Sequence, residues 1–146
     1  MDVATCDVLI LGASFAGLEC LYQLRRTCEG RSLSVVVVDR QAAHGYIPLV
    51  QERLVGRLDP EASALPTARC VEKDSRTRYV VDEVIGFAPE THTVTLASGA
   101  RLRGEYVVIA LGAVLAAPPT VPGRELLLVY KFADEHASTR VRLHEA

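Results

Sequence analysis

The sequence predicts an α/β fold in which a strand–helix–strand unit opens a central parallel sheet, with helices on its faces and an added β meander. Cys6–Leu11 is an apolar run of strand length, and Leu18–Cys28 repeats apolar side chains at helical spacing. Val35–Val38 is four consecutive valines, which is typical of a parallel strand covered on both faces. Together these segments form a βαβ unit, whose crossover is expected to be right-handed.

The elements beyond the βαβ unit are shorter. The second strand is expected over Ser32–Asp39, and two short helices are expected over Glu52–Leu58 and Thr67–Lys73. The sequence then predicts a meander with two turns, a third buried run and a polar helix, in the order Arg78–Phe87, Pro89–His92, Thr93–Leu96, Ser98–Ala100, Tyr106–Leu111 and Phe132–His144.

Composition excludes several classes of protein. The chain has 146 residues, of which 49% are hydrophobic and 23% charged, with a formal net charge of -2. This suits a globular domain with a core, and it lacks the basic patch of a nucleic-acid-binding protein. No apolar run reaches the roughly 20 residues of a membrane-spanning helix, and no basic region precedes the first apolar run. A cytoplasmic location is therefore expected. The four cysteines lack zinc-site spacing.

The turn after the first strand has the pattern of a phosphate-binding turn. It reads Gly12-Ala13-Ser14-Phe15-Ala16-Gly17, so the first and third glycines of GxGxxG are present and Ser14 replaces the second. Gly12 permits a tight turn, and Gly17 lets the helix pack closely on the strand. The N–H groups of the first helical turn can then hold a diphosphate. A ligand-free glycine turn is the alternative.

An acidic residue follows at the end of the second strand. Asp39 stands where a carboxylate is expected to accept a hydrogen bond from a ribose hydroxyl. An acid there disfavours a 2′-phosphate, so FAD or NAD fits better than NADP. Arg40 could serve a 2′-phosphate instead, or border the adenosine.

These segments resemble the pyridine nucleotide–disulfide oxidoreductase superfamily, above all its type II NADH dehydrogenases and sulfide:quinone oxidoreductases. Asp7–Leu18 is similar to the segment with which those proteins begin their FAD-binding fold. Val38–Arg40 is similar to the end of their second strand, and His44–Leu49 to the loop that approaches the flavin.

The resemblance extends to later segments. Glu83-Val84 is similar to the strand whose backbone meets the adenine. Glu105–Gly112 is similar to the family's Ala-Thr-Gly segment, with Leu111 in place of the threonine, and Pro122-Gly123 is similar to the Pro-Gly that follows it.

The resemblance implies a Rossmann-like FAD-binding domain over residues 1–146. The implied FAD contacts are Gly12, Ala13, Ser14, Phe15, Ala16, Gly17, Asp39, Arg40, Pro48, Val84, Ala110, Leu111 and Gly112. The NAD(P)-binding domain of a two-dinucleotide flavoprotein has no counterpart in this sequence. We therefore interpret the chain as incomplete, a fragment rather than a reduced relative.

The implied function is transfer of electrons from NAD(P)H through FAD to a quinone or similar acceptor, with NAD(P)H and the acceptor bound through the missing half. The sequence assigns no catalytic residue. A sulfide- or sulfur-oxidising flavoprotein and a non-catalytic adenine-dinucleotide-binding module are the alternatives. Binding at the inner face of the membrane and a homodimer are left open.

The loop that follows the second strand bears on the type of redox chemistry. Gln41–Val50 contains no cysteine, which argues against dithiol chemistry. His44 is interpreted as a polar loop residue, with a proton donor near the flavin as the alternative. Cys70 is the cysteine whose position is most consistent with reactivity, although no charge pattern beside it supports that role.

Overall fold

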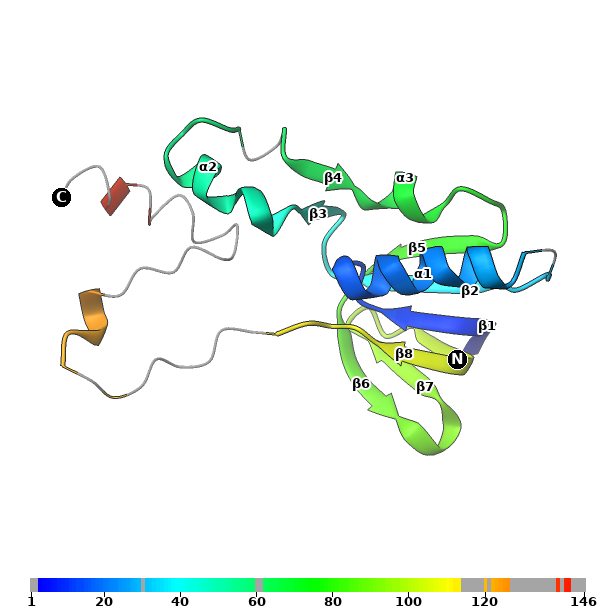
Figure 1. Cartoon of the computed structure of the whole chain (residues 1–146). Helices are drawn as coiled ribbons and strands as arrows, with labels where there is room; N and C mark the ends of the chain where they lie inside the picture. The colour runs from blue at the N-terminus through cyan, green and yellow to red at the C-terminus, as the bar shows by residue number, and fades with distance from the viewer. Residues whose placement is uncertain are drawn as a thin grey trace. The chain divides into compact units, whose positions relative to one another are not determined.

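The computed structural model describes residues 3–29, 31–59, 62–113, 120, 122–126, 139 and 141–142. The chain divides into two compact units, the first made of Met1–His44 and Pro66–Ala113, the second of Gly45–Leu65 and Val114–Ala146. Among the described residues, the first unit contains a six-stranded sheet that carries the glycine turn (Figure 1).

The sheet is part parallel and part antiparallel. Its strand order is β5-β2-β1-β8-β7-β6. β5, β2, β1 and β8 run parallel, whereas β7 and β6 continue the sheet as an antiparallel meander. The bounds are β1 Val3–Leu11, β2 Val35–Asp39, β5 Thr77–Val81, β6 Val84–Ala88, β7 Thr93–Leu96 and β8 Arg101–Ile109.

Two hydrophobic clusters among the described residues form the core of this unit. In the first, alternate side chains of β1 and β2 pack with α1 (Phe15–Thr27) and α3 (Thr67–Val71). In the second, the intervening side chains of the same strands pack with residues of β7 and β8. The predicted α/β class with a parallel sheet and a meander is confirmed, and β7 contributes Val94 and Leu96 to the second cluster.

Three predicted strands agree closely with the structure, and one does not. β1 and β2 contain the apolar runs read from the sequence, and β7 has the expected bounds. The single strand expected over Arg78–Phe87 is wrong, because the chain breaks at Asp82-Glu83 into β5 and β6. The Asp82 carboxylate accepts the N–H of Glu83 at 2.8 Å and that of Ser98 at 3.4 Å. These bonds hold the break, so β5 pairs with β2 while β6 pairs with β7.

The buried run expected over Tyr106–Leu111 is also wrong in part. Tyr106, Ile109 and Leu111 are 64%, 62% and 55% exposed. β7 pairs with β8 only as far as Arg103. Beyond that residue β8 has β1 as its one neighbouring strand among the described residues, so fewer side chains cover it.

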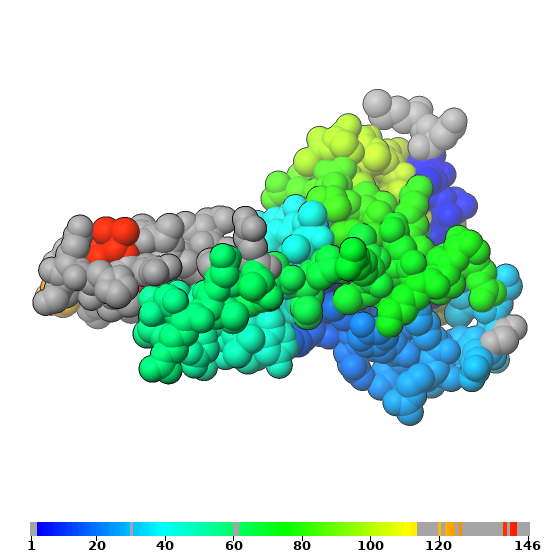
Figure 2. All heavy atoms as spheres, turned by 90° about the horizontal axis from the view of Figure 1, so that it is seen from above, coloured from blue at the N-terminus to red at the C-terminus, as the bar shows by residue number. Residues whose placement is uncertain are grey.

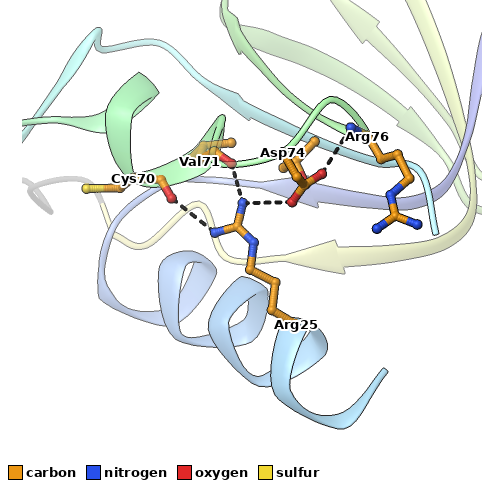
Figure 3. A network of polar contacts seen from close by, with 6 residues as sticks. Arg25, Cys70, Val71, Asp74 and Arg76 are labelled. Carbon is orange, nitrogen blue, oxygen red and sulfur yellow. Dashed lines mark hydrogen bonds and ion pairs between the residues drawn. The ribbon is translucent and has the colours of Figure 1, made fainter. Parts of the chain in front are cut away.

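A guanidinium group joins α1 to the end of α3. Arg25 donates hydrogen bonds to the carbonyl oxygens of Cys70 and Val71, the first at 3.1 Å, and forms an ion pair with Asp74 at 3.5 Å (Figure 3). Figure 2 shows the blue atoms of α1 against the green atoms of the α3–β5 segment. The last turn of α1 is thus fixed by a basic side chain. At its other end the helix begins at Phe15, three residues earlier than predicted.

The second unit contains short elements among its described residues. The 3-10 turn Ile47–Leu49 (η1) leads into α2 (Val50–Leu54), which starts two residues before the predicted helix and ends four residues earlier. β3 (Ala43–Gly45) and β4 (Ala64–Pro66) pair with each other as a two-stranded sheet. Most of the helix predicted over Phe132–His144 lies outside the described residues. In the described ranges, none of the helices is both long and apolar enough to span a membrane.

Candidate functional site

The candidate site lies in the first unit, at the carboxyl ends of the parallel strands β1, β2 and β8. Gly12 follows β1 and donates its N–H to the carbonyl oxygen of Val38 in β2 at 2.7 Å. On the other side of β1, the N–H of Ala110 donates to the carbonyl oxygen of Leu11 at 2.7 Å. The ends of open α/β sheets are where such folds bind ligands, and the glycine turn lies at that edge.

The first and third positions of the glycine pattern are occupied by glycine because backbone atoms fill the adjacent space. A Cβ on Gly12 would lie 2.2 Å from the carbonyl oxygen of Ala110, and Gly12 has a φ of +101°. A Cβ on Gly17 would lie 1.8 Å from the carbonyl oxygen of Gly12. The structure thus shows the tight turn and close helix packing that the sequence predicted for these two residues.

The first turn of α1 suits an anion. Ser14 is the N-cap residue and makes no side-chain capping hydrogen bond, and the first turn contains no acidic residue. The first N–H groups of an α-helix have no acceptor within the helix, and the helix dipole adds positive potential there. A phosphate group can therefore be held at this end, with the Ser14 hydroxyl beside it as a further donor.

The Asp39 carboxylate is joined directly to the glycine turn. Its Oδ2 accepts the N–H of Ala13 at 2.7 Å, and its Oδ1 accepts the N–H of Gln41 at 2.9 Å. Each carboxylate oxygen can accept a second hydrogen bond, so Asp39 keeps acceptor capacity for ribose hydroxyls. Arg40 follows with an exposed side chain.

The other residues of the implied FAD set fall into two groups. Ala110, Leu111 and Gly112 follow β8, and the Ala110 carbonyl lies against Gly12. Val84 begins β6, two residues after Asp82, whose N–H donates to the carbonyl oxygen of Asp39 at 2.9 Å. Ala110 therefore lies beside the glycine turn, and the segment that leads to Val84 is joined to the end of β2. Pro48 lies in η1 of the second unit and is exposed.

His44 is not the polar loop residue that the sequence indicated. It lies in β3 and is buried, with 9% of its surface exposed. Its ring meets the Phe15 ring edge-on, at 4.9 Å between centroids and an interplanar angle of 89°. The correction follows from packing, since Phe15 at the start of α1 offers an aromatic surface next to it.

The comparison with protein families agrees with this geometry. The model of the pyridine nucleotide-disulphide oxidoreductase family matches residues 6–145, which is nearly the whole chain. The chain belongs to this family. The family is one of flavin-dependent NAD(P)H oxidoreductases, and the match includes every residue of the site.

Solved structures show the same fold. Sulfide:quinone oxidoreductase from Aquifex aeolicus aligns with a TM-score of 0.81 and 22% identity, over 98% of this chain and 32% of that chain. NDH2 from Plasmodium falciparum, in complex with NADH, aligns with a TM-score of 0.73 and 17% identity, over 92% and 28%. NADH:rubredoxin oxidoreductase from Clostridium acetobutylicum gives 0.66 and 18%, over 97% and 36%. The chain thus spans about a third of the length of these structures.

The structure adds residues that the sequence analysis missed. Gln41 and Asp82 bond to Asp39, and the Tyr79 hydroxyl donates to the carbonyl oxygen of Gln41. Tyr79 was hidden within the long strand expected over Arg78–Phe87. The adjacent acids Asp82-Glu83 were the available signal, because acidic residues are depleted in strands.

A cavity of about 170 Å³ lies in the first unit, apart from the candidate site. Val35 and Thr77, the first residues of β2 and β5, line it together with side chains from the last half of α1. It is therefore at the amino ends of these strands, away from the glycine turn. Nor does the described part of the chain bring three or more His, Cys, Asp or Glu side chains together as a metal site.

Proposed function

We propose that this chain is the FAD-binding part of an oxidoreductase that passes electrons from NAD(P)H to a quinone or similar acceptor. The observation that carries the proposal is the glycine turn, where the carbonyl oxygens of Ala110 and Gly12 lie 2.2 Å and 1.8 Å from where Cβ atoms of Gly12 and Gly17 would be. The uncapped start of α1 and the adjacent Asp39 carboxylate give the turn an anion-binding end and a hydrogen-bond acceptor.

These residues fit an adenine dinucleotide. The diphosphate would be held by the N–H groups at the start of α1, with Gly12, Gly17 and Ser14 around it. The Asp39 carboxylate would accept a hydrogen bond from a hydroxyl of the adenosine ribose, and the backbone of Val84 would contact the adenine. Bound FAD would supply the redox chemistry, accepting a hydride and passing its electrons on to the acceptor. The family resemblance supports FAD over NAD at this first site, and the same resemblance assigns Arg40, Pro48, Leu111 and Gly112 to it.

The test is FAD uptake by the purified chain of 146 residues. We expect a flavin absorbance spectrum, intact mass for the chain and FAD released on denaturation. Asp39→Asn is expected to weaken FAD binding by about tenfold to a hundredfold, since a hydrogen bond to a charged group contributes about 1.5–3 kcal/mol. Glu90→Gln is the control, because it removes an exposed carboxylate in the turn between β6 and β7. A folded chain that binds NAD but takes up no FAD would overturn the assignment.

A second candidate is a sulfide-oxidising flavoprotein, because the Aquifex aeolicus sulfide:quinone oxidoreductase has the highest TM-score of the three structures compared above. Reduction of the flavin in the full-length protein separates the candidates. NADH reduction supports the first proposal, and sulfide reduction supports the second. A retained flavin that neither donor reduces would support a non-catalytic adenine-dinucleotide-binding module. Vesicle binding by the full-length protein tests the membrane association left open above.

A further inference from the structure

Asp39, the last residue of β2, takes part in three hydrogen bonds that hold it in place. Asp39 receives the N–H of Ala13 and the N–H of Gln41 on its two carboxylate oxygens. Its own carbonyl oxygen receives the N–H of Asp82 at 2.9 Å, at the end of β5. A carboxylate with one N–H on each oxygen has a fixed orientation, so its remaining lone pairs point in set directions.

Tyr79, in the neighbouring strand, also makes a hydrogen bond to the turn that follows β2. It lies in β5 opposite Val37 of β2, and its ring packs against the first hydrophobic cluster. Its hydroxyl donates to the carbonyl oxygen of Gln41. Burial, together with the nearby Asp39 carboxylate, raises the pKa of Tyr79 to about 12. The phenol therefore stays protonated at neutral pH and remains a donor.

The peptide groups of Gln41 are thus held from both sides. The N–H of Gln41 bonds to Asp39, and its carbonyl oxygen bonds to Tyr79. Without the Tyr79 hydroxyl, the turn through Arg40 and Gln41 can rotate, and the N–H that orients Oδ1 of Asp39 moves with it. The hydrogen bond from Ala13 alone would leave the carboxylate free to swing about its Cβ–Cγ bond.

We infer that Tyr79 is a positioning residue for the adenosine ribose, acting through Gln41 and Asp39. The inference rests on the proposed function, since it assigns Asp39 to the ribose hydroxyls. β2 separates Tyr79 in β5 from the glycine turn. Tyr79 therefore contacts the turn through Arg40 and Gln41 rather than the nucleotide. Its contribution is expected to appear as affinity for the nucleotide and to depend on the Asp39 carboxylate.

A double-mutant cycle tests this in the chain of 146 residues, with FAD as the probe. Tyr79→Phe removes the hydroxyl and keeps the packed ring, and it is expected to weaken FAD binding by about threefold to tenfold, the range of one net hydrogen bond. In an Asp39→Asn background the same change is expected to have less than a twofold effect, because residues in one network are not additive. Tyr22→Phe is the matched control, since Tyr22 lies in α1 under the Lys73 ammonium group.

Hydrogen exchange of the nucleotide-free chain gives a readout that needs no FAD. The Gln41 and Ala13 amides are expected to exchange faster in Tyr79→Phe than in the wild type, and unchanged exchange there would overturn the inference. Equal FAD affinity of Tyr79→Phe and wild type, or an equal loss in both Asp39 backgrounds, would also overturn it while leaving the proposed function standing. A folded wild type that binds no FAD would overturn both.

Discussion

Replacing Gly17 with alanine measures how closely α1 packs on the glycine turn. The added Cβ would lie 1.8 Å from the carbonyl oxygen of Gly12, 3.0 Å from its carbonyl carbon and 3.3 Å from Cγ2 of Ile10. In an open helix the same change would stabilise the protein by about 1 kcal/mol, because alanine favours the helix. Overpacking usually costs about 1–3 kcal/mol, and here the obstacle is backbone that no rotamer change can move.

The clash is therefore expected to outweigh the helix propensity. We expect Gly17→Ala to lower the free energy of unfolding by about 2 kcal/mol. It should also weaken FAD binding, because α1 must shift away from the turn that holds the diphosphate. Urea unfolding followed by circular dichroism gives the first quantity, and flavin titration gives the second.

Gly86→Ala provides a matched control for this change. A Cβ on Gly86 would lie 3.7 Å from Cβ of Thr95, which is an ordinary van der Waals distance. We expect the control to keep wild-type stability to within about 0.5 kcal/mol. If Gly17→Ala proved as stable as the wild type, or more stable, then helix propensity would dominate and the close approach of α1 to Gly12 would be refuted.

Three further predictions concern the same unit. Arg25→Lys should lower the free energy of unfolding by about 1–2 kcal/mol, because a lysine cannot reach both α3 carbonyls and Asp74, whereas the exposed neighbour Arg26→Lys should change it by less than about 0.5 kcal/mol in the same urea assay. Burial raises the pKa of Asp74, but hydrogen bonds from Arg76 and Thr77 and the Arg25 charge outweigh it and lower the pKa below its usual 3.8. A lowered folded pKa stabilises above the unfolded value, so the stability difference between wild type and Asp74→Asn should be constant near neutral pH and shrink as the pH falls below 3.8; a difference that grows on acidification would contradict it. Ser14→Ala should leave the unfolding free energy of the FAD-free chain within about 0.5 kcal/mol of wild type, since there is no capping bond to lose, and a larger loss would show that the hydroxyl caps α1.

The sequence predicted the parts of this protein that depend on neighbouring residues. β1, the glycine turn, α1 and β2 follow one another in chain order, and each has its own local pattern. The tight turn at Gly12 and the close helix packing at Gly17 are confirmed in the structure, because a turn between a strand and a helix restricts the backbone in a way that one short segment reveals.

Tertiary structure decided which segments meet. The acids Asp82-Glu83 indicate a break within Arg78–Phe87, but they do not show that the segment before them pairs with β2 and the segment after them with β7. The exposure of Tyr106 depends on where β7 stops pairing with β8. The hydrogen bond from Tyr79 to Gln41 joins residues 38 positions apart. Local sequence determines the conformation of a segment. A contact between residues so far apart in the sequence forms only once the sheet sets the distance and direction between strands.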